Sequence, residues 1–389
     1  MEVAVIGVGQ TPFGLFPKRS LKSLFWEAFE EALRDVEKGL DPKDVQEAWI
    51  GTLSTGGGQL GNQAALLCES VGLVGVSAHH VENACASGGF AFRNAVLAIR
   101  SGACRVALAG GIEKMSDLPR ERNRLWLGVS GDVEWERLAG TNFPGIYAML
   151  ARRHMHEHGT LKEWITGVAV KNHANALHNP KAQFRFPLEL GKALQAPMLA
   201  DPLTVFDACG ITDGAAVAIL CRKQDAASYT DRPVWVLGSG AGTDYLAIHD
   251  RKDLTGLAAA RKAAFEAYKE AGVGPEGIHV AEVHDCFTIA EIMAYEDLGF
   301  CGDGEGGFLI RDKITEIQGP RPVNPSGGLK AKGHPIGATG IGQICEMVHQ
   351  LRGDVLEPSR QVRGAKVGLT HNVGGSGGTA VVHIFRGPE

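Results

Sequence analysis

At 389 residues the chain is longer than one hydrophobic core usually serves, so its length predicts two or three domains. Hydrophobic residues make up 44% and charged residues 21% of the chain, a globular composition that excludes disordered, collagen-like and disulfide-scaffold proteins. The net charge of −5 offers no basic surface for phosphate groups, so we expect neither nucleic acid nor a membrane as a main partner.

Apolar strands and amphipathic helices alternate in the first 112 residues. The strands are short, nearly continuous apolar runs, and the helices repeat apolar residues every three or four positions. In chain order we predict strand 3–8, helix 21–36, strand 48–53, helix 63–71, strand 81–84, helix 90–100 and strand 106–109. This alternation predicts a parallel α/β sheet.

Residues 113–200 differ in pattern and composition, because apolar strand-like runs become rare while Arg, His and Trp become frequent. We predict an inserted, mostly helical loop domain over the carboxyl edge of the sheet, where α/β proteins bind ligands. His154, His156 and His158 alternate along one predicted helix. Residues two apart do not share a helix face, so we expect a solvated surface there and no metal site.

The sheet is predicted to resume after the insert, and a second half then repeats the first in outline. The elements expected are strands 215–220 and 234–238, helix 254–271, strand 280–283, helix 288–298 and strand 366–370. Strand 280–283 runs into Cys286 and its helix much as strand 81–84 runs into Cys85 and its helix. This likeness predicts an internal duplication.

The predicted duplication divides the chain into three parts. Residues 1–112 plus 201–250 form the first half, 113–200 the loop domain and 251–389 the second half. Glycine is unusually frequent, with 52 residues, and the cluster at 374–378 predicts a tight loop that lets backbone approach a ligand.

The eight cysteines are far apart in the sequence and form no C-x-x-C pair, which argues against a zinc or redox dithiol site. In a chain of this size they indicate reduced thiols and a cytoplasmic location. No run of about 18 apolar residues occurs, so no membrane span is predicted.

Two residues suggest nucleophilic catalysis. Cys85 stands where a strand turns towards a helix, whose N–H groups and positive end would favour its thiolate. Local context alone fits a packed core thiol equally well. His334 offers the base that a thiol needs, in a Gly-His-Pro turn opening a helix. A lone loop histidine is more often solvated, but flanking glycines leave room for a ligand.

Three motifs in order give the chain a recognisable signature: Asn-Ala-Cys-Ala-Ser-Gly at 83–88, Asn-Pro-Ser-Gly-Gly with Gly-His-Pro-Ile-Gly-Ala at 324–338, and the glycine cluster at 374–378. Together they resemble the thiolase superfamily over nearly the whole chain. His-Asp-Cys-Phe at 284–287 resembles the archaeal and sterol-carrier-protein-type members. The resemblance implies a duplicated α/β fold in five layers, αβαβα, carrying the loop domain.

The resemblance also implies a two-step acyl transfer through a covalent thioester. Cys85 would hold the acyl group and His334 would take its proton. Better known thiolases use a second cysteine near the C-terminus as a second base, and His371 stands in its slot here. Cys286 is therefore expected to replace it, with a core thiol as the alternative reading.

Two oxyanion sites follow from this chemistry. His284 and His334 are expected to donate to an enolate oxygen. At the acylated sulfur, the N–H of Cys85 would act with the loop that contains His371, Val373 and Gly375. Two further residues, Cys209 and Gly337, are expected to contact coenzyme A.

The main prediction is a thiolase that joins two acyl-CoA thioesters or cleaves a 3-oxoacyl-CoA, with coenzyme A as substrate or product and no permanently bound cofactor. Alternatives are a thiolase for bulkier or aromatic 3-oxoacyl-CoA, a decarboxylating ketoacyl synthase using His334 with His371, and a non-catalytic acyl-CoA or lipid-binding subunit. The resemblance implies a homodimer or tetramer and makes a small OB-fold zinc-ribbon partner plausible.

Overall fold

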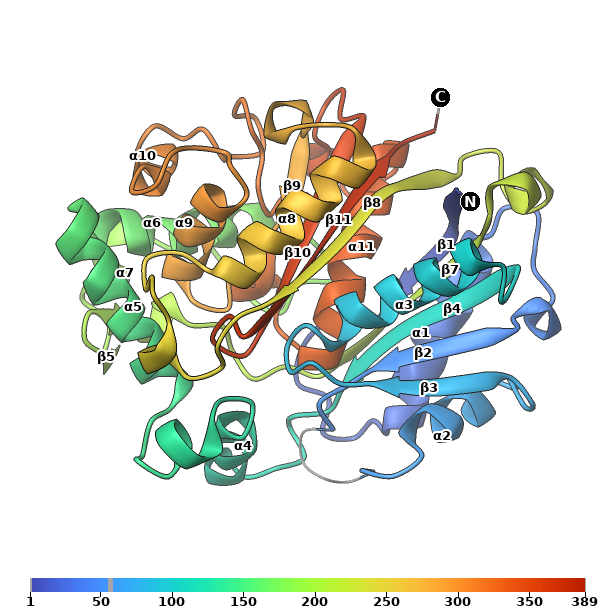
Figure 1. Cartoon of the computed structure of the whole chain (residues 1–389), viewed down its shortest axis with the longest axis horizontal. Helices are drawn as coiled ribbons and strands as arrows, with labels where there is room; N and C mark the ends of the chain where they lie inside the picture. Colours follow the sequence, from blue (N-terminus) through green and yellow to red (C-terminus); the bar gives the residue numbers. More distant parts are fainter. Residues whose placement is uncertain (1, 55–58, 389) are drawn as a thin grey trace.

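A computed structural model describes residues 2–54 and 59–388 of the chain (Figure 1). The main sheet contains β1 Val3–Gln10, β2 Glu47–Gly51, β3 Ser77–Val81, β4 Val106–Glu113, β7 Gly214–Arg222, β8 Val234–Thr243, β9 Val280–Glu282, β10 Val367–Gly374 and β11 Thr379–Arg386. Their order across the sheet is β3-β2-β4-β7-β1-β8-β11-β10-β9.

The strand order repeats itself on the two sides of the centre. Reading outward, β1, β7, β4 and β2 on one side match β8, β11, β10 and β9 on the other. At the centre β1 and β8 pair antiparallel, with Val3 opposite Val236 and Val5 opposite Val234. A two-fold axis between the halves would relate β1 to β8, and strands related by such an axis must run antiparallel where they pair. The predicted duplication is therefore confirmed.

The prediction of a parallel sheet is wrong, because the sheet is mixed. β2 runs parallel to β3 and β4, and β9 runs parallel to β10, but β7 and β11 are antiparallel to both their neighbours. In the second half a tight glycine turn joins β10 to β11 as a hairpin, and hairpins connect only antiparallel strands. Strand β11 was not predicted, because the glycine cluster appeared to end the pattern.

Helices form three layers around the two halves of the sheet. The helices concerned are α1 Leu21–Asp35, α2 Gln63–Ser70, α3 Ser87–Ser101, α8 Ala258–Ala271, α9 Thr288–Asp297 and α11 Ile336–Arg352. α1 covers β1 and β7, α8 covers β8 and β11, and α3 and α11 pack together between the two halves. The expected five-layer αβαβα arrangement is thus present.

Glycines let the outer helices lie close to the central strands. A Cβ at Gly7 of β1 would lie 2.5 Å from the carbonyl oxygen of Ala32 in α1, and a Cβ at Gly242 of β8 would lie 2.5 Å from that of Ala259 in α8. Both contacts are too short for a side chain to be accommodated. The same device in both halves shows that these glycines serve helix packing.

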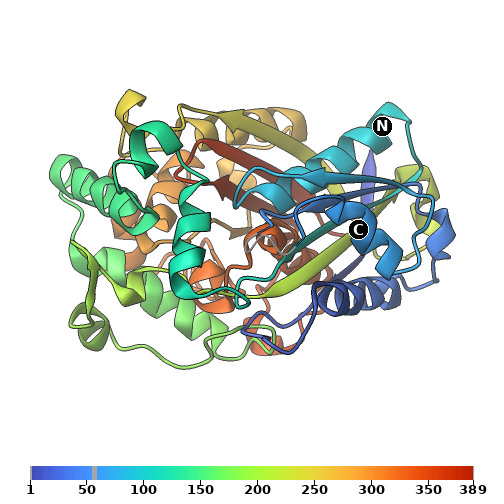
Figure 2. The same cartoon turned by 90° about the horizontal axis from the view of Figure 1, so that it is seen from below.

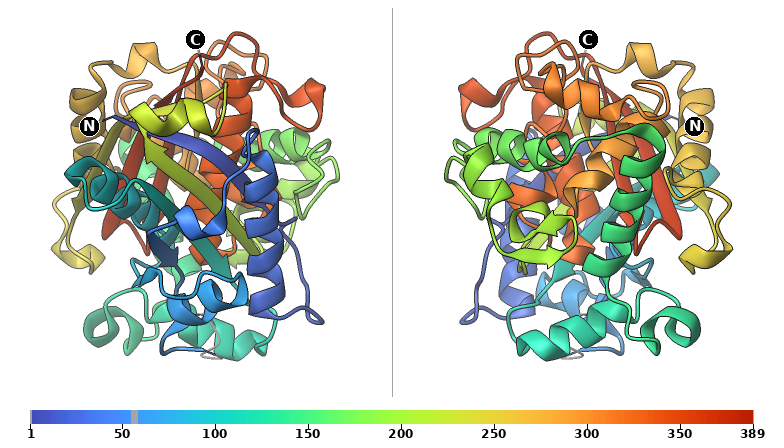
Figure 3. Two further views of the ribbon diagram at one scale, coloured as in Figure 1. Left: turned by 90° about the vertical axis from the view of Figure 1, so that its right-hand side faces the viewer. Right: turned by 90° about the vertical axis from the view of Figure 1, so that its left-hand side faces the viewer.

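The chain between β4 and β7 is mostly helical, as predicted. It contains α4 Arg120–Gly128, α5 Phe143–His158, α6 Lys162–Ala176, α7 Leu190–Leu194 and the short strands β5 Met198–Ala200 and β6 Leu203–Thr204. Figure 2 and the right-hand view of Figure 3 show these helices, in green, gathered at one end of the molecule. The boundaries at 113 and 200 stay a prediction.

One expectation within this region is wrong. His154 is fully buried, because its ring lies between Thr160 Oγ1 at 2.8 Å and Glu296 Oε2 at 3.2 Å, and only His156 is exposed. All eight cysteines are unpaired. Within the described ranges, no helix has the length and apolar character to cross a membrane.

Candidate active site

Cys85 lies in a tight turn between strand β3 and helix α3. The strand ends at Val81, so the predicted strand 81–84 is displaced by a few residues. Ala84 has a φ of 49°, in the left-handed region, and reverses the chain. Ser87 Oγ accepts from the N–H of Asn83 at 3.0 Å and donates to the carbonyl of Ala84 at 2.6 Å. This turn places the thiol beside the N-terminus of α3.

Burial controls the protonation of this thiol. It raises the pKa of Cys85 to about 12, and the backbone N–H groups of Gly375 and Cys85 oppose the shift only in part. The helix N-terminus therefore does not produce a free thiolate at neutral pH. The thiol needs a base to become a nucleophile.

A cavity of about 440 Å³ opens beside Cys85. Of the residues singled out in the sequence, Cys85, Cys209, Cys286, His334 and Gly375 line it. The loop domain contributes Asn123, Leu127, Ser130, Asn142, Phe143 and Tyr147. The lining combines apolar side chains with a few polar groups, which is typical of a small-molecule site.

His334 presents a free lone pair to the site. Thr339 Oγ1 donates to the carbonyl of Pro335 at 2.9 Å, so it accepts from His334 Nδ1 at 2.6 Å. This places the proton on Nδ1 and leaves Nε2, which has no partner among the described residues, as an acceptor. Burial lowers the pKa of His334 to about 3, so the ring is neutral at pH 7 and can take a proton.

His284 has the opposite tautomer. Asn372 Oδ1 accepts from the N–H of Gly89 at 3.2 Å, so Asn372 Nδ2 donates to the carbonyl of Cys85 at 3.0 Å and to His284 Nδ1 at 3.1 Å. The ring proton then sits on Nε2, which has no hydrogen-bond partner in the described chain. Burial, with His334 nearby, lowers the pKa of His284 well below its usual range. His284 is therefore a neutral donor.

The base and the donor converge on one sulfur. Cys85 Sγ and ring nitrogens of His284 and His334 lie within 4.8 Å of one another. The two rings are nearly perpendicular, at 88°, with centroids 5.1 Å apart. One sulfur and two imidazoles can suit zinc, but a nitrogen that carries a proton cannot bind a metal, and Asn372 keeps that proton on His284.

Cys286 places a second thiol on the same cavity. Burial raises its pKa well above the usual range, and a hydrogen bond from the Tyr147 hydroxyl opposes this shift. Asp285 lies between the two site residues and accepts from the N–H groups of Leu329 and Lys330, at 2.6 and 3.1 Å. This anchoring positions both His284 and Cys286.

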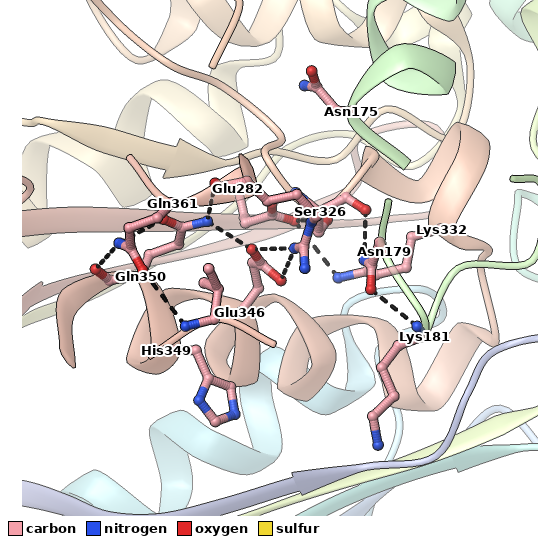
Figure 4. Close-up of polar contacts among 12 residues, drawn as sticks. Asn175, Asn179, Lys181, Glu282, Ser326, Lys332, Glu346, His349, Gln350 and Gln361 are labelled. Atoms are coloured by element: carbon pink, nitrogen blue, oxygen red, sulfur yellow. Dashed lines mark hydrogen bonds and ion pairs between the residues drawn. The ribbon is translucent and has the colours of Figure 1, made fainter. Parts of the chain in front are cut away.

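A buried ion pair links the loops of the two histidines (Figure 4). Glu282 precedes His284 by two residues and Lys332 precedes His334 by two residues, and their Oε2 and Nζ atoms are 3.6 Å apart. Ser326 donates to Glu282 from its backbone N–H at 3.0 Å and from Oγ at 2.7 Å. One carboxylate thus holds three segments of the second half together.

Two family models match the chain in sequence: the thiolase N-terminal domain over residues 3–192, and a domain described as thiolase C-terminal domain-like over residues 240–387. An acetyl-CoA acetyltransferase of Methanothermobacter thermautotrophicus is 45% identical over 385 residues, which are 99% of each chain. The chain belongs to the thiolase family. The predictions of a thiolase and of an acyltransferase are confirmed.

Other comparisons agree with this assignment. Rabbit (Oryctolagus cuniculus) sterol carrier protein 2 is 33% identical over 400 residues, covering 99% of this thiolase and 72% of that protein. A solved structure described as the Ltp2-ChsH2(DUF35) aldolase superposes with a TM-score of 0.84 at 25% identity, covering 98% of this thiolase and 97% of that chain. The sterol-carrier-protein-type resemblance is supported, and the non-catalytic alternative is not favoured.

Four residues singled out in the sequence do not line the cavity of this thiolase: His284, His371, Val373 and Gly337. Side chains alternate along a strand, so His371 and Val373 lie on the opposite side of β10 from Asn372. Neither ring nitrogen of His371 has a hydrogen-bond partner within the described chain. Gly337 is buried where α11 meets the sheet, and a Cβ there would lie 2.5 Å from the carbonyl oxygen of Ile112. The roles that the sequence analysis assigned to these four residues, and to the residues that line the cavity, stay predictions.

The sequence reasoning missed Asn372, Thr339 and Tyr147. Asn372 had a usable signal, because side chains alternate along a strand and only one of two neighbours on β10 can face α3. Thr339 and Tyr147 had none, since their importance depends on which distant residues they contact.

Proposed function

We propose that this thiolase transfers acetyl groups between thioesters of coenzyme A, forming or cleaving acetoacetyl-CoA through an acyl group bound to Cys85. The observation that carries the proposal is the pairing at one sulfur of a lone-pair nitrogen on His334 and an N–H donor on His284, all within 4.8 Å. The 45% identity to an acetyl-CoA acetyltransferase over 99% of both chains supports the acetyl substrate and does not favour a bulkier one.

In the first step His334 Nε2 takes the proton of Cys85, and the thiolate attacks the thioester carbonyl. The N–H groups of Gly375 and Cys85, which point at the sulfur, are placed to stabilise the resulting oxyanion. Collapse of this intermediate breaks the bond to the coenzyme A sulfur, and the His334 proton returns to that leaving thiolate.

In the second step Cys286, in its thiolate form, removes a proton from the α-carbon of a second acetyl-CoA, and this proton passes to the Cys85 thiolate when that group leaves at the end of the step. The His284 Nε2–H donates to the enolate oxygen that forms. The carbanion then attacks the acyl carbon on Cys85, and the Cys85 thiolate leaves. Thiolysis runs through the same steps in reverse.

Peptide mass spectrometry after incubation with acetyl-CoA tests the acyl-enzyme. We expect the acetyl group on Cys85 and release of one coenzyme A per site. An acetyl group found only on another cysteine would exclude the proposal.

We also propose a homodimer formed through strand β3. Among the described strands, β3 pairs with β2 alone, and it exposes Ser77, His79 and His80, so an unpaired backbone edge faces solvent. Exposed strand edges readily pair with a second chain. The Ser77 N–H donates inward to the Gln46 carbonyl at 3.4 Å, so the N–H of the next residue, Ala78, faces the free edge. Light scattering of the protein and of an Ala78→Pro variant, which cannot donate from that edge, tests this: the variant should be monomeric.

A partner protein and a cytoplasmic location belong to the proposal as well. The similarity to the Ltp2-ChsH2(DUF35) aldolase, whose description joins two components, supports a small partner of DUF35 type. The eight unpaired cysteines support a reducing compartment. Co-purification from the native host, followed by assay with and without the bound protein, tests the partner.

A further inference from the structure

Tyr147 brings the loop domain into direct contact with the second thiol. It lies on α5, is 1% exposed and lines the same cavity as Cys85 and Cys286. Its ring stacks on Phe287 with a centroid distance of 4.5 Å and an interplanar angle of 20°. This stacking fixes the ring, so the hydroxyl has a defined position between Cys286 and the glycine turn.

The hydroxyl has two partners. It donates to the carbonyl oxygen of Gly375 at 3.1 Å, and the Cys286 thiol on the same cavity lies close enough to exchange a hydrogen bond with it. Gly375 is also the residue whose N–H points at the Cys85 sulfur. Arg251 Nη1 holds the next carbonyl, that of Ser376, at 2.7 Å. The turn beside Cys85 is therefore held at adjacent carbonyls by Tyr147 and Arg251.

A phenol has only one proton to donate. While Cys286 is a thiol, Tyr147 can donate to Gly375 and accept from the S–H. When Cys286 is a thiolate, the same O–H is the group placed to donate to the sulfur. Burial raises the pKa of Tyr147 well above its usual range, so the phenol keeps its proton in both states.

We propose that Tyr147 donates a hydrogen bond to the Cys286 thiolate and thereby supports the carbon-centred step of the reaction. This rests on the proposed function only for the identity of that step. The proton moves from the α-carbon of the substrate to Cys286 Sγ and the C–H electron pair becomes the enolate, while Tyr147 gains and loses no proton. A hydrogen bond to a charged group accounts for about a 10- to 100-fold effect.

The test is Tyr147→Phe, with Tyr268→Phe as the matched control, because the Tyr268 hydroxyl donates to the Leu298 carbonyl at 2.9 Å away from the cavity. We expect Tyr147→Phe to lower acetoacetyl-CoA thiolysis by about 10- to 100-fold. Acetylation of Cys85 by acetyl-CoA, measured by intact-protein mass, should fall clearly less than thiolysis. That step does not use Cys286, and the Gly375 turn that it does use is still held by Arg251 at the Ser376 carbonyl. Tyr268→Phe should change neither.

A second readout follows the Cys286 thiolate itself. In a Cys85→Ala background, alkylation of Cys286 by iodoacetamide is measured against pH by peptide mass spectrometry. The other titratable or charged groups around Cys286 and Tyr147 are Cys85, Cys209, Asp285 and Arg251. Tyr147→Phe should move the alkylation midpoint upward by about one pH unit, a tenfold loss of thiolate at a given pH.

The outcomes separate this proposal from the proposed function. If acetyl-CoA proves not to be a substrate, the alkylation midpoint still tests Tyr147. An unchanged midpoint, or equal losses in acetylation and thiolysis, would overturn the proposal. If Tyr147→Phe does not fold, 3-fluorotyrosine at position 147 decides, because it keeps the ring and is a stronger donor. It should move the midpoint downward, and no movement would again overturn the proposal.

Discussion

The two halves of this thiolase place different chemistry at equivalent positions. Helices α3 and α11 are the matching central helices of the halves, and Cys85 precedes one as His334 precedes the other. The helices meet at glycines: a Cβ at Gly88 would lie 2.5 Å from the carbonyl oxygen of Gly337, and a Cβ at Gly340 would clash with the backbone N of Gly89. Cys85 and His334, the proposed nucleophile and base, thus meet because duplication placed two helix N-termini side by side.

The match between the halves corrects one point of the sequence analysis, which treated Cys286 as the counterpart of Cys85 in the second half. β9 corresponds to β2 in the strand order, so Cys286 lies after the second strand of its half and not after the third. The counterpart of β3 in the second half is a single bridge between Ala281 and Val323. A duplicated fold therefore supplies the proposed catalytic pair from matching positions and the second thiol from a non-matching one.

Of all the changes considered, removing Cys85 should reduce the activity most. Cys85→Ala leaves no sulfur for the acyl group at α3, so acetylation and thiolysis should both fall by about 10⁴-fold or more. His334→Ala removes only the equivalent base and should cost about 10²- to 10⁴-fold. Intact-protein mass and steady-state thiolysis measure both effects. Cys68→Ala, a buried thiol in α2, is the control, and a comparable loss in it would contradict the assignment.

Removing Cys286 should separate the two steps. Cys286→Ala should still accept an acetyl group on Cys85 but lose about 10²- to 10⁴-fold in thiolysis, because only the carbon-centred step needs the second base. His371→Asn, which changes a ring outside the cavity, should reduce thiolysis less. If His371→Asn proves as inactive as Cys85→Ala while Cys286→Ala stays active, the one-Cys, two-His chemistry of ketoacyl synthases fits better.

Filling the contact between the central helices should lower stability. Gly340→Ala forces a Cβ against Gly89 N and Asn372 Oδ1, and we expect a loss of about 1 to 3 kcal/mol in the free energy of unfolding. Gly191→Ala in α7, where a Cβ meets no described atom within 4 Å, is the matched control and should be neutral or slightly stabilising. Urea unfolding measures both. A neutral Gly340→Ala would show that the helices can separate freely.

Acid should distinguish the halves through the protonation of buried histidine rings. Burial lowers the pKa of His334, His371 and His383 from 6.5 to about 3, and all three lie in the second half. Between pH 6.5 and 3 the unfolded chain binds more protons than the folded chain does. The free energy of unfolding therefore falls by about 1.4 kcal/mol per ring for each unit by which the pH is lowered. His371→Asn should reduce this slope in urea unfolding measured between pH 5 and 7. The exposed His156→Gln should leave it unchanged.

Hydrogen exchange can show which half of the molecule loses its structure first in acid. Below about pH 5, the amides of β10 and β11 should lose protection before those of β2 and β4, because the neutral buried rings belong to the second half. Simultaneous loss in both halves would mean that acid acts on the fold as one unit.

The sequence by itself determined the local elements and the reactive residues. Apolar periodicity placed a helix over 21–36 where α1 spans Leu21–Asp35, and a strand over 3–8 where β1 spans Val3–Gln10. Such patterns succeed because a buried helix face or strand depends mainly on neighbouring residues. The motifs likewise singled out Cys85, Cys286 and His334, which do line one cavity.

Only the tertiary structure decided strand direction, histidine tautomers and the surroundings of the second thiol. Asn372 bonds Cys85 from 287 positions away, and Tyr147 bonds Gly375 from 228 positions away. No local period encodes contacts over such separations. The orientation of one amide determines which nitrogen of His284 carries the proton, and the approach of one phenol determines what can stabilise the Cys286 thiolate. Both depend on how the two halves and the loop domain pack.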